Sequence, residues 1–94
     1  MDEIVLGGNI VLQGFRAVKS GEVVIVKKIV GQFVKEISTK GNFQKFILEL
    51  KSFPPFCLKA TLQTDKETAA EEKDNNLFFA LNKVLKGVEQ QSVA

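Results

Sequence analysis

The chain has 94 residues, of which 45% are hydrophobic and 26% are charged, and its formal net charge is +2. A chain of this length and composition is typical of a single globular domain with one core, so we expect one domain over residues 1–94. No apolar run approaches the roughly 18 residues that a membrane span needs, so no membrane partner is expected. Because the basic excess is weak, attraction to an acidic partner would depend on where the lysines lie.

Several residue types that carry chemistry are scarce. The chain has one cysteine and no histidine, tyrosine or tryptophan. A disulfide within the chain is excluded, and a cytoplasmic location is favoured. Without histidine, the commonest general base is missing and zinc ligation is disfavoured. We therefore predict no catalytic residue, metal site, cofactor or small-molecule substrate. A small enzyme or ligand carrier with carboxylates in a cleft is the least favoured class.

The first element is predicted to be a strand. Ile4–Gln13 contains two aliphatic runs separated by Gly7-Gly8. We expect one strand with a kink or bulge at these glycines, ended by Gly14 and followed by a connector over Phe15–Lys19. The glycines do not form a phosphate-binding loop, because no Lys-Ser or Lys-Thr pair follows them.

A helix is predicted next. Ser20 suits its N-cap, Glu22 suits the positive end of its dipole, and Gly41 suits its C-terminal stop. The β-branched run Val23–Val26 leaves a strand open, but the later spacing favours a helix over Val23–Ser38. Apolar residues at helical spacing form one broad arc: Val23, Val26, Ile29, Val30, Phe33, Val34 and Ile37.

Two strands with alternating polarity follow. Phe43–Phe53 places its apolar residues on one face, and Phe56–Gln63 does the same after the turn at Pro54-Pro55. We expect these strands to pair antiparallel. The polar segment that follows leaves two alternatives for Glu67–Glu72, a short edge strand or a solvated loop.

The last third of the chain predicts a second helix. Asp74 or Asn75 is expected to cap it, and Gln90–Ala94 is expected to fray. Its apolar stripe consists of Leu77, Phe78, Leu81, Val84, Leu85 and Val88.

The element order β-α-β-β-(β)-α predicts an α+β two-layer sandwich with a mostly antiparallel sheet and both helices on one face. Cys57 is then expected on the uncovered sheet face beside Ile47. A reactive thiol would need nearby cations, for which Lys45 and Lys59 are candidates, but an inert side chain is favoured.

Lysines on the outer arcs of the two helices are the candidate binding residues. If the helices pack side by side, these arcs form one basic stripe that suits RNA phosphates, and Phe79 can stack on a base or join a protein interface. The same residues also fit an ordinary solvated helix surface. The candidates are Lys27, Lys28 and Lys35 on the first helix and Phe79, Lys83 and Lys86 on the second.

Three segments resemble the ribosome-hibernation family of ribosome-associated inhibitors (the S30AE type, or sigma-54 modulation proteins). Gly7-Gly8-Asn9-Ile10 is similar to the Gly-x-Asn-Ile of that family's first strand, and Phe46–Leu62 to its central hairpin. Asn76–Leu81, continuing to Gln91, is similar to its final helix. The resemblance implies a β-α-β-β-β-α fold like that of double-stranded-RNA-binding domains over nearly the whole chain. The chain departs from the family at Asn76, where Asp is preferred, in the extra residues Gly14–Lys19, and in having fewer basic helix residues.

The resemblance also implies a function. It points to a non-enzymatic factor that binds rRNA in the decoding region of the small ribosomal subunit, blocks mRNA and tRNA, and inhibits translation. The helix lysines Lys27, Lys28, Lys35, Lys83 and Lys86 would contact rRNA phosphates. The alternative is a protein-interaction or homodimerisation module that shares only the fold and uses the open sheet face (Ile47, Cys57 and Thr61) or an exposed strand edge.

Overall fold

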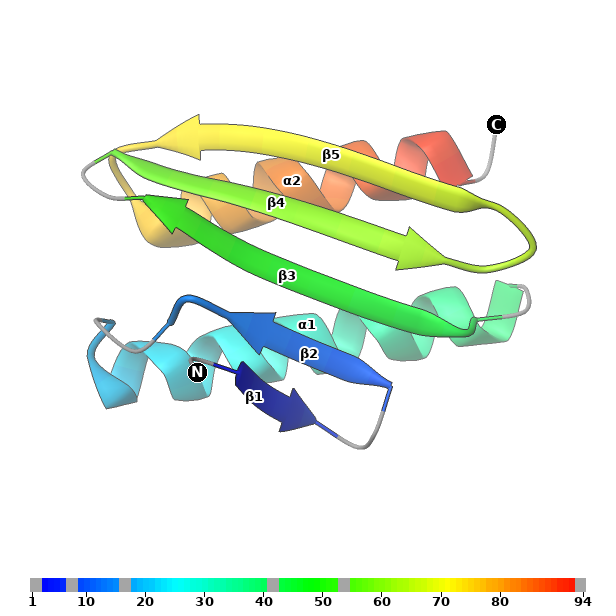
Figure 1. Cartoon of the computed structure of the whole chain (residues 1–94), viewed down its shortest axis with the longest axis horizontal. Coiled ribbons are helices and arrows are strands. Elements are labelled where there is room, and N and C mark those ends of the chain that lie inside the picture. Colours follow the sequence, from blue (N-terminus) through cyan, green and yellow to red (C-terminus); the bar gives the residue numbers. More distant parts are fainter. Residues whose placement is uncertain (1–2, 7–8, 16–17, 41–42, 53–54, 93–94) are drawn as a thin grey trace.

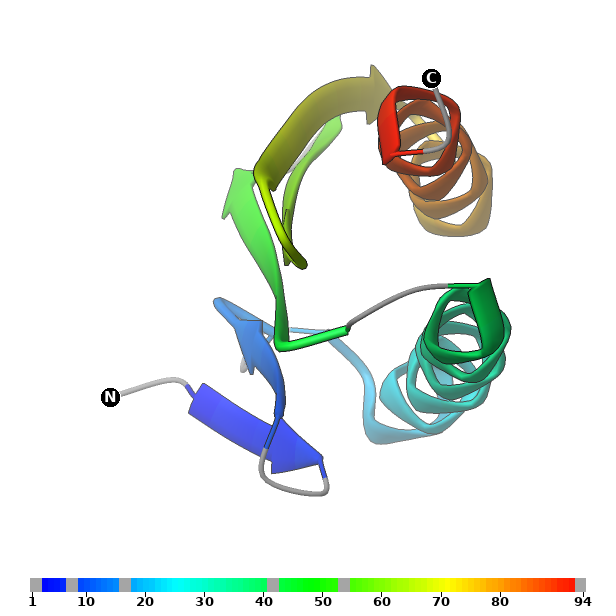
Figure 2. The same ribbon diagram turned by 90° about the vertical axis from the view of Figure 1, so that its right-hand side faces the viewer.

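In the part of the chain that the structure describes, five strands form one sheet and two helices cover one face of it. The computed structural model describes residues 3–6, 9–15, 18–40, 43–52 and 55–92. In chain order (Figure 1), the elements are β1 (Glu3–Leu6), β2 (Ile10–Gln13), α1 (Ser20–Lys40), β3 (Lys45–Ser52), β4 (Phe56–Gln63), β5 (Glu67–Asp74) and α2 (Leu77–Ser92). The strands lie in the sheet in the order β1-β2-β3-β4-β5, and Figure 2 shows both helices on the same side. The predicted α+β two-layer sandwich is confirmed.

The N-terminal segment is a hairpin, so the prediction of one bulged strand over Ile4–Gln13 is wrong. β1 pairs antiparallel with β2, with Leu6 opposite Ile10. A glycine pair between two short aliphatic runs is as compatible with a chain reversal as with a bulge. The reversal also brings Ile4 and Leu6 against the core. Gly7-Gly8 lie outside the described residues.

The connection from β2 to β3 places α1 over the sheet. These two strands are parallel, with Ile10 opposite Phe46 and Leu12 opposite Leu48. Parallel neighbours cannot be joined by a tight turn, so the chain crosses the sheet face as a helix before it re-enters. The helices shield these two residue pairs from solvent, and Leu12, Phe46 and Leu48 have no exposed surface.

α1 confirms the helical alternative for Val23–Val26. Val26 and Val30 are fully buried, and the burial of one helical face outweighs the strand propensity of the β-branched run. The predicted N-cap at Ser20 is wrong, because the helix already includes Ser20. The carbonyl of Lys19 accepts the N–H of Val23 at 3.0 Å, so Lys19 holds the cap position. Gly41 lies outside the described residues.

The central hairpin has the predicted strands. β3 and β4 pair antiparallel, with Phe46 opposite Leu62 and Leu50 opposite Leu58. The following polar segment is a strand, so the loop alternative is wrong. β5 pairs along its full length with β4 and places Thr68 and Ala70 on the helix side of the sheet edge.

The predicted fraying of Gln90–Ala94 is wrong for the part that the structure describes. α2 continues to Ser92. The amide of Gln91 donates to the carbonyl of Ala69 at 3.2 Å, and the ammonium of Lys66 donates to the carbonyl of Gln91 at 3.4 Å. These contacts tie the last turn of α2 to β5 and to the turn that precedes it.

Gly14 and Phe15 fix the chain where it leaves β2 toward α1. Phe15 is a core residue with 1% of its surface exposed, although we expected only a linker there. Gly14 turns the chain with φ +78°, and a Cβ at this position would overlap the carbonyl oxygen of Leu50. Both the backbone conformation and the close approach require glycine.

Replacing Gly14 by alanine is therefore expected to lower the free energy of unfolding by about 2–4 kcal/mol, from the left-handed backbone and the overlap. Gly31→Ala is the matched control. A Cβ at Gly31, within α1, meets nothing within 4 Å, so alanine is expected to raise the unfolding free energy by about 1 kcal/mol through its helix propensity. Urea unfolding of the two variants checks both signs. A Gly14→Ala variant as stable as the wild type would contradict this account of the turn.

Candidate nucleic-acid interface

An open groove of about 700 Å³ lies between the two helices. Buried and half-buried apolar side chains, Ile29, Phe33 and Leu85, form its floor. Polar and charged side chains form its walls: Lys28, Gln32 and Glu36 from α1, and Asn82, Lys83, Lys86 and Glu89 from α2.

The charges in this groove are separated along its length. The two helices run in the same direction over the sheet (Figure 1). On α1, Lys28 precedes Glu36 by two turns, about 12 Å at 1.5 Å per residue. On α2, Lys83 and Lys86 precede Glu89. The groove is therefore basic toward the N-terminal ends of the helices and acidic toward their C-terminal ends.

The groove gathers some of the predicted site residues and leaves others outside. Lys28, Lys83 and Lys86 line it. Lys27 and Lys35 are not among the lining residues. A helix turns by about 100° per residue, so Lys27 points well away from the side of α1 that Lys28 shares with the groove. The expected single stripe is therefore only partly formed, because three of its lysines line the groove. Lys35, seven residues after Lys28, shares that side of α1 but is not a lining residue, whereas Lys27 points elsewhere.

Phe79 stands at the N-terminal end of α2 with 61% of its surface exposed. Residues at positions i, i+4 and i+7 share one helix face, so Phe79 lies on the same side as Lys83 and Lys86. An exposed aromatic ring beside two ammonium groups can contact a base while the lysines contact phosphates.

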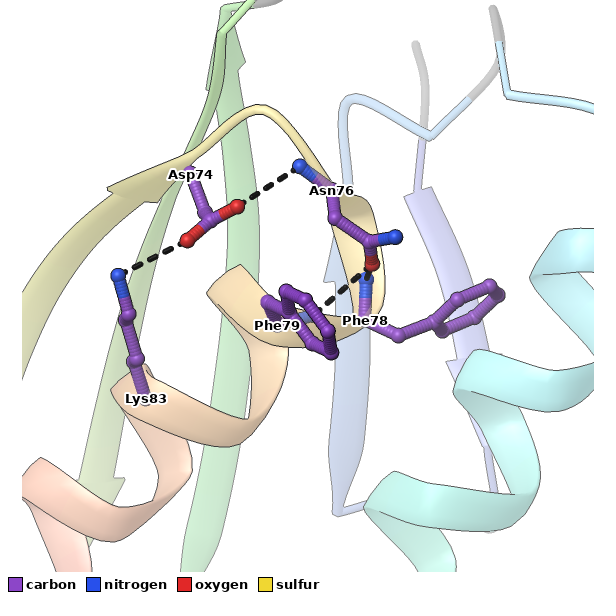
Figure 3. A network of polar contacts seen from close by, with 5 residues as sticks. All are labelled: Asp74, Asn76, Phe78, Phe79 and Lys83. Carbon is purple, nitrogen blue, oxygen red and sulfur yellow. Dashed lines mark hydrogen bonds and ion pairs between the residues drawn. The ribbon is translucent and has the colours of Figure 1, made fainter.

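Asn76 caps α2, so the prediction of Asp74 or Asn75 is wrong. The Oδ1 atom of Asn76 accepts the N–H groups of Phe78 at 2.9 Å and Phe79 at 3.1 Å (Figure 3). Asp74 is instead the last residue of β5, and its carboxylate accepts hydrogen bonds from two other groups. It accepts the N–H of Asn76 at 2.9 Å and the ammonium of Lys83 at 2.9 Å.

The Asp74–Lys83 ion pair changes the acidity of both partners. The hydrogen bond from Lys83, followed by that from the Asn76 N–H, lowers the pKa of Asp74 below its ordinary value. The same hydrogen bond raises the pKa of Lys83. Both groups stay ionised at neutral pH, and Asp74 holds Lys83 in one orientation while offsetting part of its charge.

Several groove residues escaped the sequence analysis. Gln32 and Glu36 follow Lys28 at four-residue intervals, and this spacing could have placed them on one line of α1. Glu89 closes the acidic end from α2. The lysine pattern alone did not show that acidic residues limit the basic part of the groove.

Cys57 lies on the uncovered face of the sheet, but the prediction that it neighbours Ile47 is wrong. The strand register places Cys57 opposite Ser52 and Lys73, whereas Ile47 lies opposite Thr61. The thiol is 5% exposed and donates to Glu71 at 3.2 Å. Burial, and then this hydrogen bond, raise the pKa of the Cys57 thiol, so it is neutral and weakly nucleophilic at physiological pH.

Within the described part of the chain, no group of three or more His, Cys, Asp or Glu side chains is placed to hold a metal ion. Neither of the described helices has the length and apolar character needed to cross a membrane.

Comparison with known proteins adds no relative: no protein-family model matches the sequence, and no curated protein matches it.

The cap at Asn76 predicts a specific loss of stability. Asn76→Ala removes the acceptor for two N–H groups at the start of α2 and should lower the unfolding free energy by about 1 kcal/mol. Asn75→Ala, one residue earlier, keeps that acceptor and should stay within about 0.5 kcal/mol of the wild type. Urea unfolding of both variants measures the difference. Equal losses would show that Asn76 does not act as the cap.

The Asp74–Lys83 pair predicts a pH dependence. Because the pKa of Asp74 is lowered on folding, its contribution to stability is present above the ordinary carboxyl pKa and is lost as the pH falls through the lower, folded value. The difference in unfolding free energy between the wild type and Asp74→Asn should be constant near neutral pH and should shrink below about pH 4. Urea unfolding across this range tests it. In a Lys83→Gln background, Asp74→Asn should have a smaller effect, and an undiminished effect would contradict the pairing.

Proposed function

We propose that the protein is a small, non-enzymatic, cytoplasmic factor that binds rRNA of the small ribosomal subunit and inhibits translation. One observation carries the proposal: Lys28, Lys83 and Lys86, from two helices far apart in the sequence, line the same groove. The resemblance of three segments of the chain to ribosome-hibernation factors supports rRNA as the nucleic acid.

The basic end of the groove suits a short stretch of RNA backbone. Three ammonium groups neutralise about three phosphates, and Glu36 and Glu89 discourage the backbone from continuing along the groove. The salt dependence should therefore be modest, with a slope of about −2 to −3 in a plot of log affinity against log salt.

Polar and aromatic groups around the lysines would position the bound RNA. The amides of Gln32 and Asn82 in the groove walls can donate to and accept from base edges. Phe79 offers a ring face for an unpaired base. Asp74 keeps Lys83 oriented before RNA arrives, which reduces the entropy lost on binding. A factor held in this way in the decoding region would exclude mRNA and tRNA sterically.

Reversing two groove charges is the test. Lys28→Glu/Lys86→Glu leaves the Asp74–Lys83 pair intact, so stability should change little. Binding to cognate small ribosomal subunits, measured by co-sedimentation at low salt, should weaken at least about ten-fold because two attractive phosphate contacts become repulsive.

The matched control makes the same charge change outside the groove. Lys27→Glu/Lys59→Glu alters α1 and the uncovered sheet face at residues that do not line the groove, and its affinity should stay within about three-fold of the wild type. Equal losses in the two variants would reject the groove as the site. A wild-type protein that fails to bind at low salt would reject the function.

A further inference from the structure

The sheet face that the helices leave uncovered carries an apolar row across all five strands. The strand register aligns its members side by side: Val5, Val11, Ile47, Thr61 and Ala69. Val5 is 58% exposed, Ala69 is exposed, Ile47 and Thr61 are half-buried, and Val11 is buried with 8% of its surface exposed. Figure 2 shows that none of the described helices and strands covers this side of the sheet.

On β3, side chains of opposite charge flank the apolar row. In β3, Lys45 lies two residues before Ile47 and Glu49 lies two residues after it, so all three side chains share the uncovered face. Lys59 of β4 is opposite Glu49. Along β3, the uncovered face therefore carries a basic, then an apolar, then an acidic side chain.

We infer that this face binds a second copy of the chain, face to face, about a two-fold axis that runs along the apolar row. Such an axis places the apolar row of one copy directly over the same row of the other copy. The facing strands of the two copies then run in opposite directions. Lys45 of each copy then faces Glu49 of the other, and the contact occurs twice. Packed sheets lie about 10 Å apart, a gap that a lysine and a glutamate side chain span together.

The charge balance of the face favours a second copy over other partners. Its basic and acidic residues are equal in number, Lys45, Lys51, Lys59 and Lys73 against Glu3, Glu49, Glu67 and Glu71. A nucleic acid or a partner of one charge sign would meet as much repulsion as attraction. On β5 the axis brings Glu67 toward Glu71 of the second copy. Glu71 is already paired with Lys51 at 4.0 Å and lies opposite Lys59, which offsets this repulsion.

Dimerisation through the edges of the sheet is less favourable than dimerisation through its uncovered face. The edge strand β5 has its Ala69 carbonyl occupied by the amide of Gln91. The other edge strand, β1, is only 4 residues long. The short β1 therefore offers few backbone groups for continuing the sheet, and one carbonyl of β5 is already used within the chain.

The size of the face sets the strength of the association. Strands about 4.8 Å apart with a rise of about 3.3 Å per residue give a footprint of about 500 Å² per copy, or about 1,000 Å² in total. This is at the low end of specific interfaces, so the dimer is reversible and weak. The helix groove lies on the other side of the sheet and stays open, so a dimer presents two grooves.

Sedimentation equilibrium of the wild type between about 10 μM and 1 mM should show a monomer–dimer equilibrium. Lys45→Glu and Glu49→Lys each turn both symmetric contacts into like-charge pairs and should weaken dimerisation roughly ten-fold. The double variant Lys45→Glu/Glu49→Lys restores opposite charges and should return to within about three-fold of the wild type. An equimolar mixture of the two single variants should form a heterodimer, because each contact then joins opposite charges. Urea unfolding confirms that each variant is folded.

Three results would overturn the inference. The first is a wild type that stays monomeric up to about 1 mM, a concentration at which even a weak interface of this size is populated. The second is a dimer that neither single variant weakens, which would indicate another interface. The third is a double variant as weak as the single variants, because the loss would then not come from the Lys45–Glu49 contact.

Discussion

The burial of β3 and β4 beneath two helices on one side of the sheet is the constraint on which the rest of the molecule depends. Phe33 of α1 meets Phe46 of β3 with ring centroids 5.5 Å apart. Leu58 and Leu62 of β4, and Leu81 and Val84 of α2, are fully buried in the same core. Since both helices are drawn to this one apolar surface, they lie near each other, and the opposite surface of the sheet keeps no cover.

Two surfaces of different character follow from that arrangement. Between the helices, lysines of α1 and α2 meet in one groove, and Asp74 at the end of β5 orients Lys83 through a 2.9 Å ion pair. On the uncovered face, the apolar row is bordered by equal numbers of positive and negative residues. The first surface suits a polyanion and the second suits a copy of itself, so binding at one leaves the other accessible.

The sequence predicted those elements whose polarity pattern is long and regular. In α1 the apolar residues recur at helical spacing from Val23 to Ile37. In the β3–β4 hairpin they alternate with polar residues between Phe46 and Leu62, and in both cases the core residues follow this spacing. For β5 the sequence predicts two alternatives, because its inner face has only Thr68 and Ala70 as small or weakly polar residues and continues with the charged Glu72 and Asp74. The N-terminal hairpin was missed because Gly7-Gly8 fits both a bulge and a reversal. The cap of α2 was misplaced because Asp74, Asn75 and Asn76 can each accept the required N–H groups, and only the end of β5 selects among them.

The candidate site was less predictable than the fold for a physical reason. Periodicity shows which lysines lie on the outer side of each helix, but not which side of one helix faces the other. That relation is set by the sheet, which holds the two helices so that Lys28 lines the same groove as Lys83 and Lys86. The four-residue spacing within α1 can place Glu36 on one line with Lys28, but only the packing of the two helices shows that Glu36 and Glu89 border one groove.

The central claim is that the groove between the helices is the surface that meets the ribosome. It is tested most directly by measuring lysine acylation by mass spectrometry, on dilute protein with and without small ribosomal subunits. The account predicts that Lys28, Lys83 and Lys86 become protected when subunits are added, while Lys45 and Lys59 on the uncovered sheet face keep their reactivity. Protection of Lys45 and Lys59 with unchanged reactivity of the groove lysines would contradict it.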